Sequence, residues 1–267
     1  MLKFISLSSG SSGNCYYIGD DSTSILIDAG IGVRTIKKRL LEYGIEIESI
    51  DFILVTHDHS DHIRHLGSVC QRYMKPVLAT NSLFKYLDSN RNTKGRINSF
   101  RRVLDKEIPF VYKNLSITAF EVPHDANENL GYFIDFGGEK FTFLTDIGSI
   151  TARLIEYCKI SNHIIIESNY DVNMLLNGGY PDYLIDRIKG GRGHLSNIET
   201  AKAIQTIYSA NSERLRNIFL CHLSDNNNTP ELAYECSYNS LCELGVSVGE
   251  DVNLYCLPRR DHICYCL

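Results

Sequence analysis

The apolar run Phe52-Ile53-Leu54-Val55 leads directly into the polar stretch Thr56-His57-Asp58-His59-Ser60-Asp61-His62. The apolar run predicts a buried strand that carries the polar stretch into a loop. Alternate side chains of an extended segment share one face, so His57 and His59 can bind one metal ion together. Asp61 and His62 lie a turn further on and can reach a second ion beside the first.

Three more candidate ligands, His124, Asp146 and His222, each come just after another apolar run. Residues at the end of a strand are exposed on a rigid edge, which suits a binding site. The candidates complete two ligand sets: His57, His59 and His124 for one ion, Asp61, His62 and His222 for the other, and Asp146 bridging both. Imidazole and carboxylate suit zinc, and manganese or iron is also accommodated because no thiolate is required.

Length and composition describe an ordinary globular chain. The 267 residues are 43% hydrophobic and 22% charged, which is enough for a large core. The net charge of −5 gives no general attraction to nucleic acid, so an anionic substrate needs a local positive feature. Nine cysteines without a C-x-x-C pair argue against a disulfide framework, and no apolar stretch reaches membrane-spanning length. We therefore expect a cytoplasmic protein without a membrane partner.

The order of the predicted elements indicates an α/β fold. Apolar runs predict strands at residues 4–7, 15–18, 24–27, 52–55, 115–122, 132–136, 141–144, 163–166, 217–220 and 253–256. Periodic apolar residues predict helices from residue 33 to Gly44, from the histidine cluster to Pro76, from the capping-box pattern at 196–199, and from Thr229-Pro230. Gly137-Gly138 predicts a hairpin turn. No boundary is visible, so we expect one domain over residues 1–267, with two packed sheets and helices outside them.

A glycine-rich loop, Gly190-Gly191-Arg192-Gly193-His194, leads into the helix that begins near Ser196. The backbone amides of such a loop and of a helix N-terminus can form a cradle for phosphate. We expect phosphate contacts from four residues: Lys189, Arg192, Ser196 and Asn197. His194 is expected to protonate a leaving oxygen. A plain loop into a helix is the alternative.

Three other features allow a structural and a functional interpretation. Residues 91–102 hold five basic residues and no acid, and form either a track for backbone phosphates or a solvated loop. His163 is more simply a hydrogen-bonded structural histidine than a ligand. The terminal group of Cys256, His262, Cys264 and Cys266 is more simply strand packing than a third metal site.

The order of Asp28, the cluster His57–His62, His124, Asp146 and His222 resembles the five signature motifs of the metallo-β-lactamase superfamily. This resemblance spans residues 28 to 222 and implies an αββα sandwich with metal ions at one edge of its sheets. It also implies that Asp28 supports the loop of residues 57–62, the metal loop, by hydrogen bonds. Common lactamases have a cysteine at the second metal and this chain has none there, so antibiotic hydrolysis is disfavoured.

Four segments resemble the YycJ/WalJ-type proteins, a compact bacterial branch of that superfamily: residues 9–14, 167–171, 193–197 and 222–227. The resemblance implies a 5′-to-3′ exonuclease that acts on double-stranded DNA with two divalent ions. It also links the chain to DNA repair and to cell-wall signalling, so partners from either process are expected candidates.

The predicted mechanism is attack on phosphorus by a hydroxide that bridges both ions. Asp61 would orient this hydroxide and accept its proton, and His194 would act as general acid. Two alternatives use the same centre: a hydrolase of small molecules (a cyclic nucleotide, thioester or lactone) and a non-catalytic regulator. The sequence leaves open the choice between DNA and RNA, the polarity of digestion, the metal, and whether the chain forms a homodimer.

Overall fold

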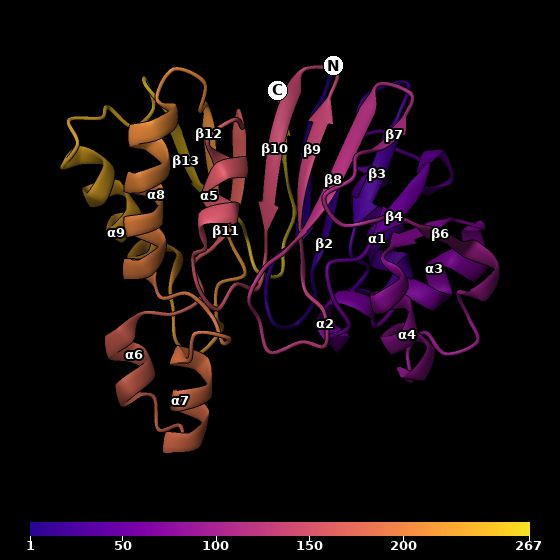
Figure 1. Cartoon of the computed structure of the whole chain (residues 1–267), viewed down its shortest axis with the longest axis horizontal. Helices are drawn as coiled ribbons and strands as arrows, with labels where there is room; N and C mark the ends of the chain where they lie inside the picture. Colours follow the sequence, from indigo (N-terminus) through magenta and orange to yellow (C-terminus); the bar gives the residue numbers. More distant parts are fainter.

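The structure is a computed structural model that describes residues 1–267. Two seven-stranded sheets pack against each other, and helices cover their outer sides (Figure 1). The strand order is β14-β1-β2-β3-β4-β5-β6 in the first sheet and β13-β12-β11-β10-β9-β8-β7 in the second. The expected four-layer αββα sandwich is therefore confirmed.

Each sheet contains a block of four parallel strands. The first sheet consists of β14 (Ile263–Cys266), β1 (Lys3–Ser8), β2 (Cys15–Gly19), β3 (Ser24–Ile27), β4 (Phe52–Leu54), β5 (Val77–Ala79) and β6 (Arg101–Val103). The second consists of β13 (Asn253–Cys256), β12 (Asn217–Cys221), β11 (His163–Glu167), β10 (Glu139–Leu144), β9 (Leu130–Phe136), β8 (Leu115–Glu121) and β7 (Phe110–Tyr112). Strands β3 to β6 are parallel, as are β10 to β13. Because parallel strands end at the same edge, each block presents a row of loops there.

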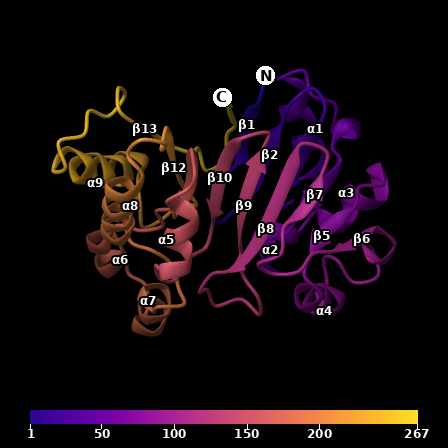
Figure 2. The ribbon, with the colours of Figure 1, turned by 45° about the horizontal axis from the view of Figure 1, so that its top comes forward.

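The helices separate into three groups. Figure 2 shows one group outside the first sheet and another outside the second. The first group is α1 (Val33–Leu41), α3 (Leu66–Tyr73) and α4 (Asn81–Ser89); the second is α5 (Ala152–Cys158), α8 (Asn197–Asn211) and α9 (Pro230–Cys242). The short helix α2 (Ser60–Ile63) lies at the lower edge in Figure 1, where α6 (Val172–Asn177) and α7 (Asp182–Lys189) project below the sheets. Two 3-10 turns, Ile47–Ser49 and Asn98–Phe100, complete the elements. None of the helices combines the length and apolar character needed to cross a membrane.

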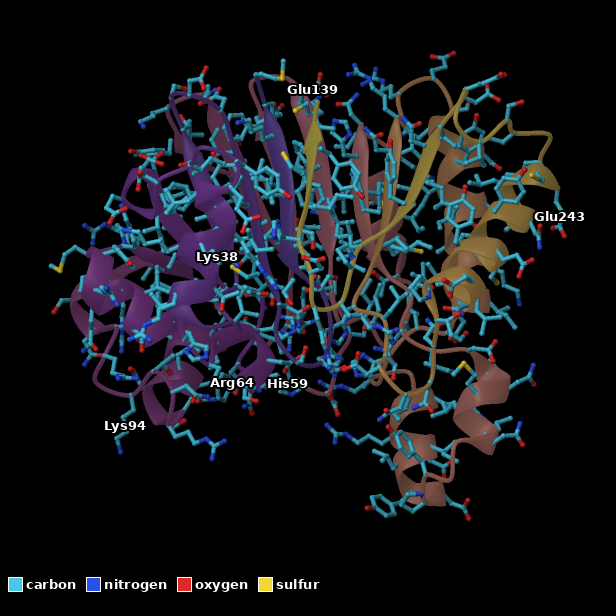
Figure 3. All side chains as sticks on the ribbon, turned by 180° about the vertical axis from the view of Figure 1, so that it is seen from behind. Lys38, His59, Arg64, Lys94, Glu139 and Glu243 are labelled. Atoms are coloured by element: carbon cyan, nitrogen blue, oxygen red, sulfur yellow. The ribbon has the colours of Figure 1, made fainter.

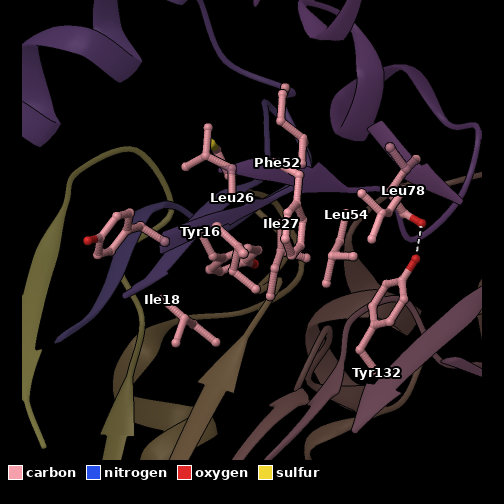
Figure 4. Close-up of a cluster of buried hydrophobic side chains, with 14 of the residues drawn as sticks. Tyr16, Ile18, Leu26, Ile27, Phe52, Leu54, Leu78 and Tyr132 are labelled. Atoms are coloured by element: carbon pink, nitrogen blue, oxygen red, sulfur yellow. Dashed lines mark hydrogen bonds between the residues drawn. The ribbon is translucent and has the colours of Figure 1, made fainter. Parts of the chain in front are cut away.

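One hydrophobic core fills the space between the sheets (Figure 4). The ring centroids of Phe4 and Phe219, from opposite sheets, are 4.8 Å apart, and those of Tyr16 and Phe143 are also 4.8 Å apart. The hydroxyl of Tyr132 donates to the carbonyl of Val55 at 2.5 Å, so the polar atom of this buried ring has a partner. This packing holds the ends of the strands, where the polar candidate residues begin.

Most local predictions are confirmed. All ten predicted strands form within two residues of the expected bounds. Ser196 and Glu199 form the expected capping box of α8, and Pro230 begins α9. Gly44 follows α1 with φ +74°, and Gly137 and Gly138 turn the hairpin with φ +62° and +103°. Positive φ favours glycine, which explains its place in these turns.

The helix predicted from the histidine cluster to Pro76 is wrong as a single helix. The chain forms α2 and α3, with Arg64 and His65 between them. The carbonyl of His62 accepts from the amide of Ala29 at 2.7 Å, and the amide of His65 donates to the carbonyl of Ala29 at 2.9 Å. These bonds to the loop after β3 replace helical ones, which periodicity alone cannot reveal.

Candidate metal centre

The candidate ligands gather at the edge of the sandwich where both parallel blocks end. From the first sheet come Asp28, after β3, and the stretch 57–62, after β4. The second sheet contributes one residue from each of four strands: His124 after β8, Asp146 after β10, Glu167 at the end of β11, and His222 after β12. Residues far apart in the sequence thus meet in one buried group.

Three of these residues, Asp28, Asp146 and His222, have a left-handed backbone, with φ of 61°, 54° and 52°. Residues other than glycine rarely adopt this conformation, and it concentrates at functional sites. Side chains hold two of these positions: Asn129 donates to the carbonyl of Asp146 at 2.7 Å, and Asn169 donates to that of His222 at 2.8 Å. The chain therefore turns sharply after each strand and is fixed in that turn.

His57, His59 and His124 form the first cluster, with one ring nitrogen of each within 4.8 Å of the other two. The Nε2 atom of His124 is 3.3 Å from Nδ1 of His59. The opposite nitrogen, Nδ1 of His124, donates to the carbonyl of Gly193 at 2.8 Å, which orients the ring. Bonding one nitrogen in this way leaves the other free to bind a metal ion.

Asp61, His62 and His222 form the second cluster by the same criterion. The Oδ2 atom of Asp61 is 3.5 Å from Nε2 of His62 and 3.5 Å from Nε2 of His222. Asp146 lies between the clusters, because its Oδ2 is 3.0 Å from Nε2 of His62 and its Oδ1 is 3.8 Å from Nε2 of His124. A carboxylate in this place can contact ions in both clusters.

Several buried atoms of the group have no hydrogen-bond partner: Nε2 of His57, Nε2 of His222 and Oδ2 of Asp146. An unsatisfied buried polar atom costs about 1–3 kcal/mol. All three residues belong to the sets whose ligand atoms lie within 4.8 Å. Imidazole nitrogen and carboxylate oxygen share one natural partner, a divalent cation. The residues present therefore fit metal ions.

The charges of the group also require positive charge at its centre. Burial opposes protonation of His222, but Asp146, Asp61 and Glu167 raise its pKa to about 10. Burial opposes ionisation of Asp146, but His222 and His62 hold the pKa of Asp146 well below its ordinary value. Ligands must lose protons to bind metal, so we expect metal affinity to rise with pH.

Asp28 has the contacts that its expected supporting role requires. Its Oδ2 accepts from the Thr56 hydroxyl at 2.7 Å and from Nδ1 of His62 at 2.6 Å. Its Oδ1 accepts from the amide of Thr56 at 2.9 Å. The fully buried carboxylate thus fixes the start of the metal loop and turns Nε2 of His62 toward the centre.

Glu167 is a residue of the site that the sequence analysis did not assign. Its buried Oε1 accepts from Nδ1 of His194 and from Nδ1 of His222, both at 2.8 Å. Its Oε2 accepts from the amides of Ile147 and Leu195, both at 3.0 Å. A signal was available, because Glu167 follows a predicted strand just as Asp146 and His222 do.

The loop before α8 brings His194 to the centre, and internal hydrogen bonds hold much of the loop in place. Each amide from residue 193 to 197 bonds within the chain, to Gly190, Ile188, Glu167, Glu199 and Tyr170 in that order. The hydroxyl of Ser196 donates to the carboxylate of Glu199. The buried side-chain amide of Asn197 accepts from the hydroxyl of Ser168 and donates to the side chain of Asn228. Helix capping and a buried network use these atoms, so Ser196 and Asn197 stabilise the loop, and their contact with a phosphate stays a prediction.

The two basic residues of this region, Lys189 and Arg192, are exposed. Arg192 donates to the carbonyl of His124 at 3.2 Å and lines a cavity of about 520 Å³ beside β8. Lys189 ends α7 without an ion pair. Another cavity, of about 360 Å³, contains His194 and Arg187. Arg187 pairs with Asp125 at 2.5 Å, so the structure places a cation near His194 that the sequence analysis did not single out.

Of the remaining candidate features, His163 and the terminal cysteines agree with their structural interpretation. His163 is buried and bonds to Glu139 at 3.0 Å and to Asn217 at 2.8 Å. All nine cysteines are free, and the terminal ones lie in β13 and β14. In the basic stretch, Arg101 pairs with Asp88, while Asn90, just before the stretch, donates to the carbonyl of Asp58 at 3.0 Å. The start of the stretch thus adjoins the metal loop.

Comparison with known proteins identifies the family. The model of the beta-lactamase superfamily domain matches residues 23–215. Exodeoxyribonuclease WalJ of Streptococcus pneumoniae is 32% identical over 254 residues, which cover 95% of this chain and 93% of that protein. Exodeoxyribonuclease YycJ of Bacillus anthracis is 32% identical over 255 residues, covering 95% and 94%. The crystal structure of the metallo-beta-lactamase fold protein YhfI from Bacillus subtilis has a TM-score of 0.71 at 14% identity, over 98% of this chain and 99% of that one.

The αββα fold and the buried group of histidines and carboxylates define a metal-dependent hydrolase with divalent cations as cofactor. The chain belongs to the beta-lactamase superfamily, and it is similar to the YycJ/WalJ-type members over nearly its whole length.

Proposed function

We propose that this protein is a nuclease with two metal ions that degrades double-stranded DNA from the 5′ end. The observation that carries the proposal is the pair of adjacent ligand clusters with Asp146 between them. His57, His59 and His124 would hold one ion, Asp61, His62 and His222 the other, and Asp146 would contact both. Zinc or manganese fits these ligands, and so does iron. The names of the relatives from two bacteria support DNA as the substrate.

Asp61 is the proposed base. Bound ions would supply an attacking hydroxide between them and neutralise charge on the phosphoryl oxygens. Burial opposes ionisation of Asp61, but His62 and His222 keep its pKa below the ordinary value, so the carboxylate is charged. The side-chain amide of Asn14 donates to Asp61 Oδ2 at 3.3 Å and fixes its direction. The carboxylate can thus orient the nucleophile and accept its proton.

His194 is the proposed acid. Its Nδ1 donates to Glu167, and the ring lines the cavity of about 360 Å³, where a leaving group can reach Nε2. Burial opposes protonation of His194, but Glu167 and Asp146 raise its pKa above the ordinary value. A ring that stays protonated near neutral pH can donate a proton to the departing oxygen.

Exposed cations near the centre are the proposed contacts to DNA phosphates. Arg192 and Lys189 flank the His194 loop, and neither forms an ion pair with a carboxylate. In the stretch 91–102, Arg91 and Lys94 are unpaired and lie next to the segment that bonds to Asp58. Local cations of this kind offset the net charge of −5.

The test is incubation of the purified protein, loaded with manganese or zinc, with duplex DNA, single-stranded DNA and RNA. Each substrate carries a label at the 5′ or the 3′ end. We expect rapid release of a 5′-labelled mononucleotide or short product from the duplex and slow shortening of 3′-labelled strands. Failure to cut any of the three would contradict the nuclease proposal.

A small-molecule hydrolase is the second candidate, because the cavity beside His194 is of a size that also suits one small ligand. It predicts turnover of a cyclic nucleotide, thioester or lactone, and no effect of Arg192→Ala. A non-catalytic regulator predicts that His59→Ala leaves the biological role intact. We also propose that residues 1–267 act as one domain, since both sheets share a single core.

A further inference from the structure

A basic cavity of about 240 Å³ lies on the first-sheet side of the metal centre. Four of its lining side chains are Arg39, Arg64, His65 and Arg260, and no acidic residue lines it. The cationic residues come from α1, from the break between α2 and α3, and from the loop before β14. Packing of the fold is therefore what brings these charges together.

The cavity and the metal loop share one wall. The amide of Asn14 donates to the carbonyl of Asp61 at 2.8 Å, and the amide of Ala29 donates to that of His62 at 2.7 Å. A Cβ atom on Gly30, which lines the cavity, would lie 1.6 Å from the carbonyl oxygen of Asp61. Only glycine permits this approach, so the cavity lies one layer of backbone away from the proposed second metal site. Figure 3 shows Arg64 and His59 at the same lower edge of the molecule.

The positive charge of the cavity is largely unneutralised. Arg64 is exposed and has no carboxylate within 4.0 Å, and its one hydrogen bond is a long contact of 3.4 Å to the carbonyl of Ser12. Arg39 donates to the carbonyls of Leu7 and Arg260 and also has no carboxylate partner. Arg260 alone is paired, with Asp225 at 2.6 Å. Arg39 and Arg64 thus carry two charges that no carboxylate neutralises, and such charges in one cavity attract an anion. Phosphate matches the planar donors of arginine.

The first turn of α1 adds donors to the same place. Gly32 and Thr35 line the cavity, and Gly32 is the N-cap of this nine-residue helix. No side chain caps the helix, so amides of its first turn are free for an anion. The two arginines without a carboxylate partner and the uncapped helix are independent observations, and both indicate phosphate chemistry.

We propose that this cavity is a subsite for a backbone phosphate of the DNA, one that neighbours the cleaved phosphodiester. Arg64 is an exposed arginine of the cavity, and Arg39 is held in place by its two carbonyl partners. The inference rests on the proposed function and adds to it the path of the strand. DNA would run from the metal centre over the loop 8–13 toward α1.

The experiment compares Arg64→Ala with Lys38→Ala in the metal-loaded protein. Lys38 is an exposed cation on α1 outside the cavity. Lys38→Ala therefore removes the same charge without changing the cavity and serves as the control. Binding is measured with a duplex whose ends carry phosphorothioate linkages and resist cleavage, over a range of salt concentrations. Arg64→Ala should weaken binding several-fold and lower the slope of log K against log salt by about one, whereas Lys38→Ala should change neither.

A second readout separates binding from chemistry. Bis(p-nitrophenyl) phosphate has a single phosphate, so its hydrolysis should be the same in Arg64→Ala and the wild type. If the wild type cuts DNA but Arg64→Ala and Lys38→Ala have equal affinity for the duplex and equal salt dependence, the subsite is overturned and the nuclease proposal is not. A wild type that neither binds nor cuts DNA would overturn both proposals.

Binding of inorganic phosphate is measured in parallel. If Arg64→Ala weakened the binding of phosphate but not of the duplex, the cavity would be a site for a free anion, and the backbone subsite would be overturned.

Discussion

The two sheets build their halves of the metal centre in opposite ways. The first sheet supplies four candidate ligands from one loop, residues 57–62, directly after β4. The second supplies one residue per strand, so its half depends on the pairing of β10, β11 and β12. A slip of one residue in that pairing would turn the side chains to the opposite face. One half is thus a property of local sequence and the other a property of strand register.

Each half has one buried carboxylate that orients imidazoles. Asp28 accepts from Nδ1 of His62 at 2.6 Å and also holds the backbone of the metal loop. Glu167 accepts from Nδ1 of both His222 and His194 at 2.8 Å. Asp28 therefore contacts one proposed metal ligand and the backbone of its loop, whereas Glu167 connects a proposed metal ligand to the proposed proton donor.

The largest effect is expected when the contact between the two halves is removed. Asp146→Ala deletes the carboxylate between the clusters, so we expect cleavage to fall on the order of 10³-fold or more. Metal content, measured by mass spectrometry, should fall below two ions per chain. Asp105→Ala removes an exposed carboxylate elsewhere and is the control. Two retained ions and near-normal cleavage would show that the halves work without Asp146.

Loss of His194 should separate chemistry from metal binding. His194→Ala removes the proposed acid but no proposed ligand, so cleavage should fall about 10²- to 10⁴-fold while metal content stays the same. The measurements are single-turnover rates and metal analysis of the same sample. Full activity would remove His194 from the mechanism, and loss of metal would make it a ligand.

The two carboxylates can be compared directly through Asp28→Asn and Glu167→Gln. Each variant should lower metal affinity or activity about 10- to 100-fold. Only Glu167→Gln should also change the pH profile. Glu167 raises the pKa of His194, so the acid form persists to higher pH; without the carboxylate the pKa falls and activity is lost at lower pH on the basic side. If both variants lost activity at the same alkaline pH, the link between Glu167 and His194 would be contradicted.

The smallest effect on activity is expected at the far end of the strand that carries Glu167. Burial lowers the pKa of His163 to about 4, although Glu139 opposes this. In the unfolded chain His163 takes up a proton near its ordinary pKa of 6.5, whereas in the folded chain it stays neutral down to about pH 4. The free energy of unfolding therefore falls as the pH drops from about 6.5 to 4, by up to about 3 kcal/mol. His163→Gln should flatten this part of the unfolding curve in urea and leave cleavage at pH 8 unchanged. An unchanged acid dependence would show that His163 is not the responsible group.

Local signals in the sequence account for much of the fold. Apolar runs such as Phe52–Val55 marked strands, and the capping residues Ser196 and Glu199 marked the start of α8. The strands β5, β6 and β7 have three residues each and were not predicted. Segments so short carry little periodic signal, and they are strands because neighbours already in the sheet pair with them. The break between α2 and α3 escaped prediction for a similar reason, since bonds to Ala29 cause it.

The chemical groups at the ends of the strands can be identified from local sequence, and with them the fold family and the candidate ligands from His57 to His222. Which atoms of those groups lack a hydrogen-bond partner depends on the folded structure. It left Nε2 of His57 and His222 unpaired, used the amides of residues 193–197 internally, and joined His194 to Glu167. It also brought Arg39, Arg64 and Arg260 into one cavity. The physical reason is that residue type and strand ends are local properties, whereas hydrogen-bond partners and charge neutralisation depend on residues distant in the chain.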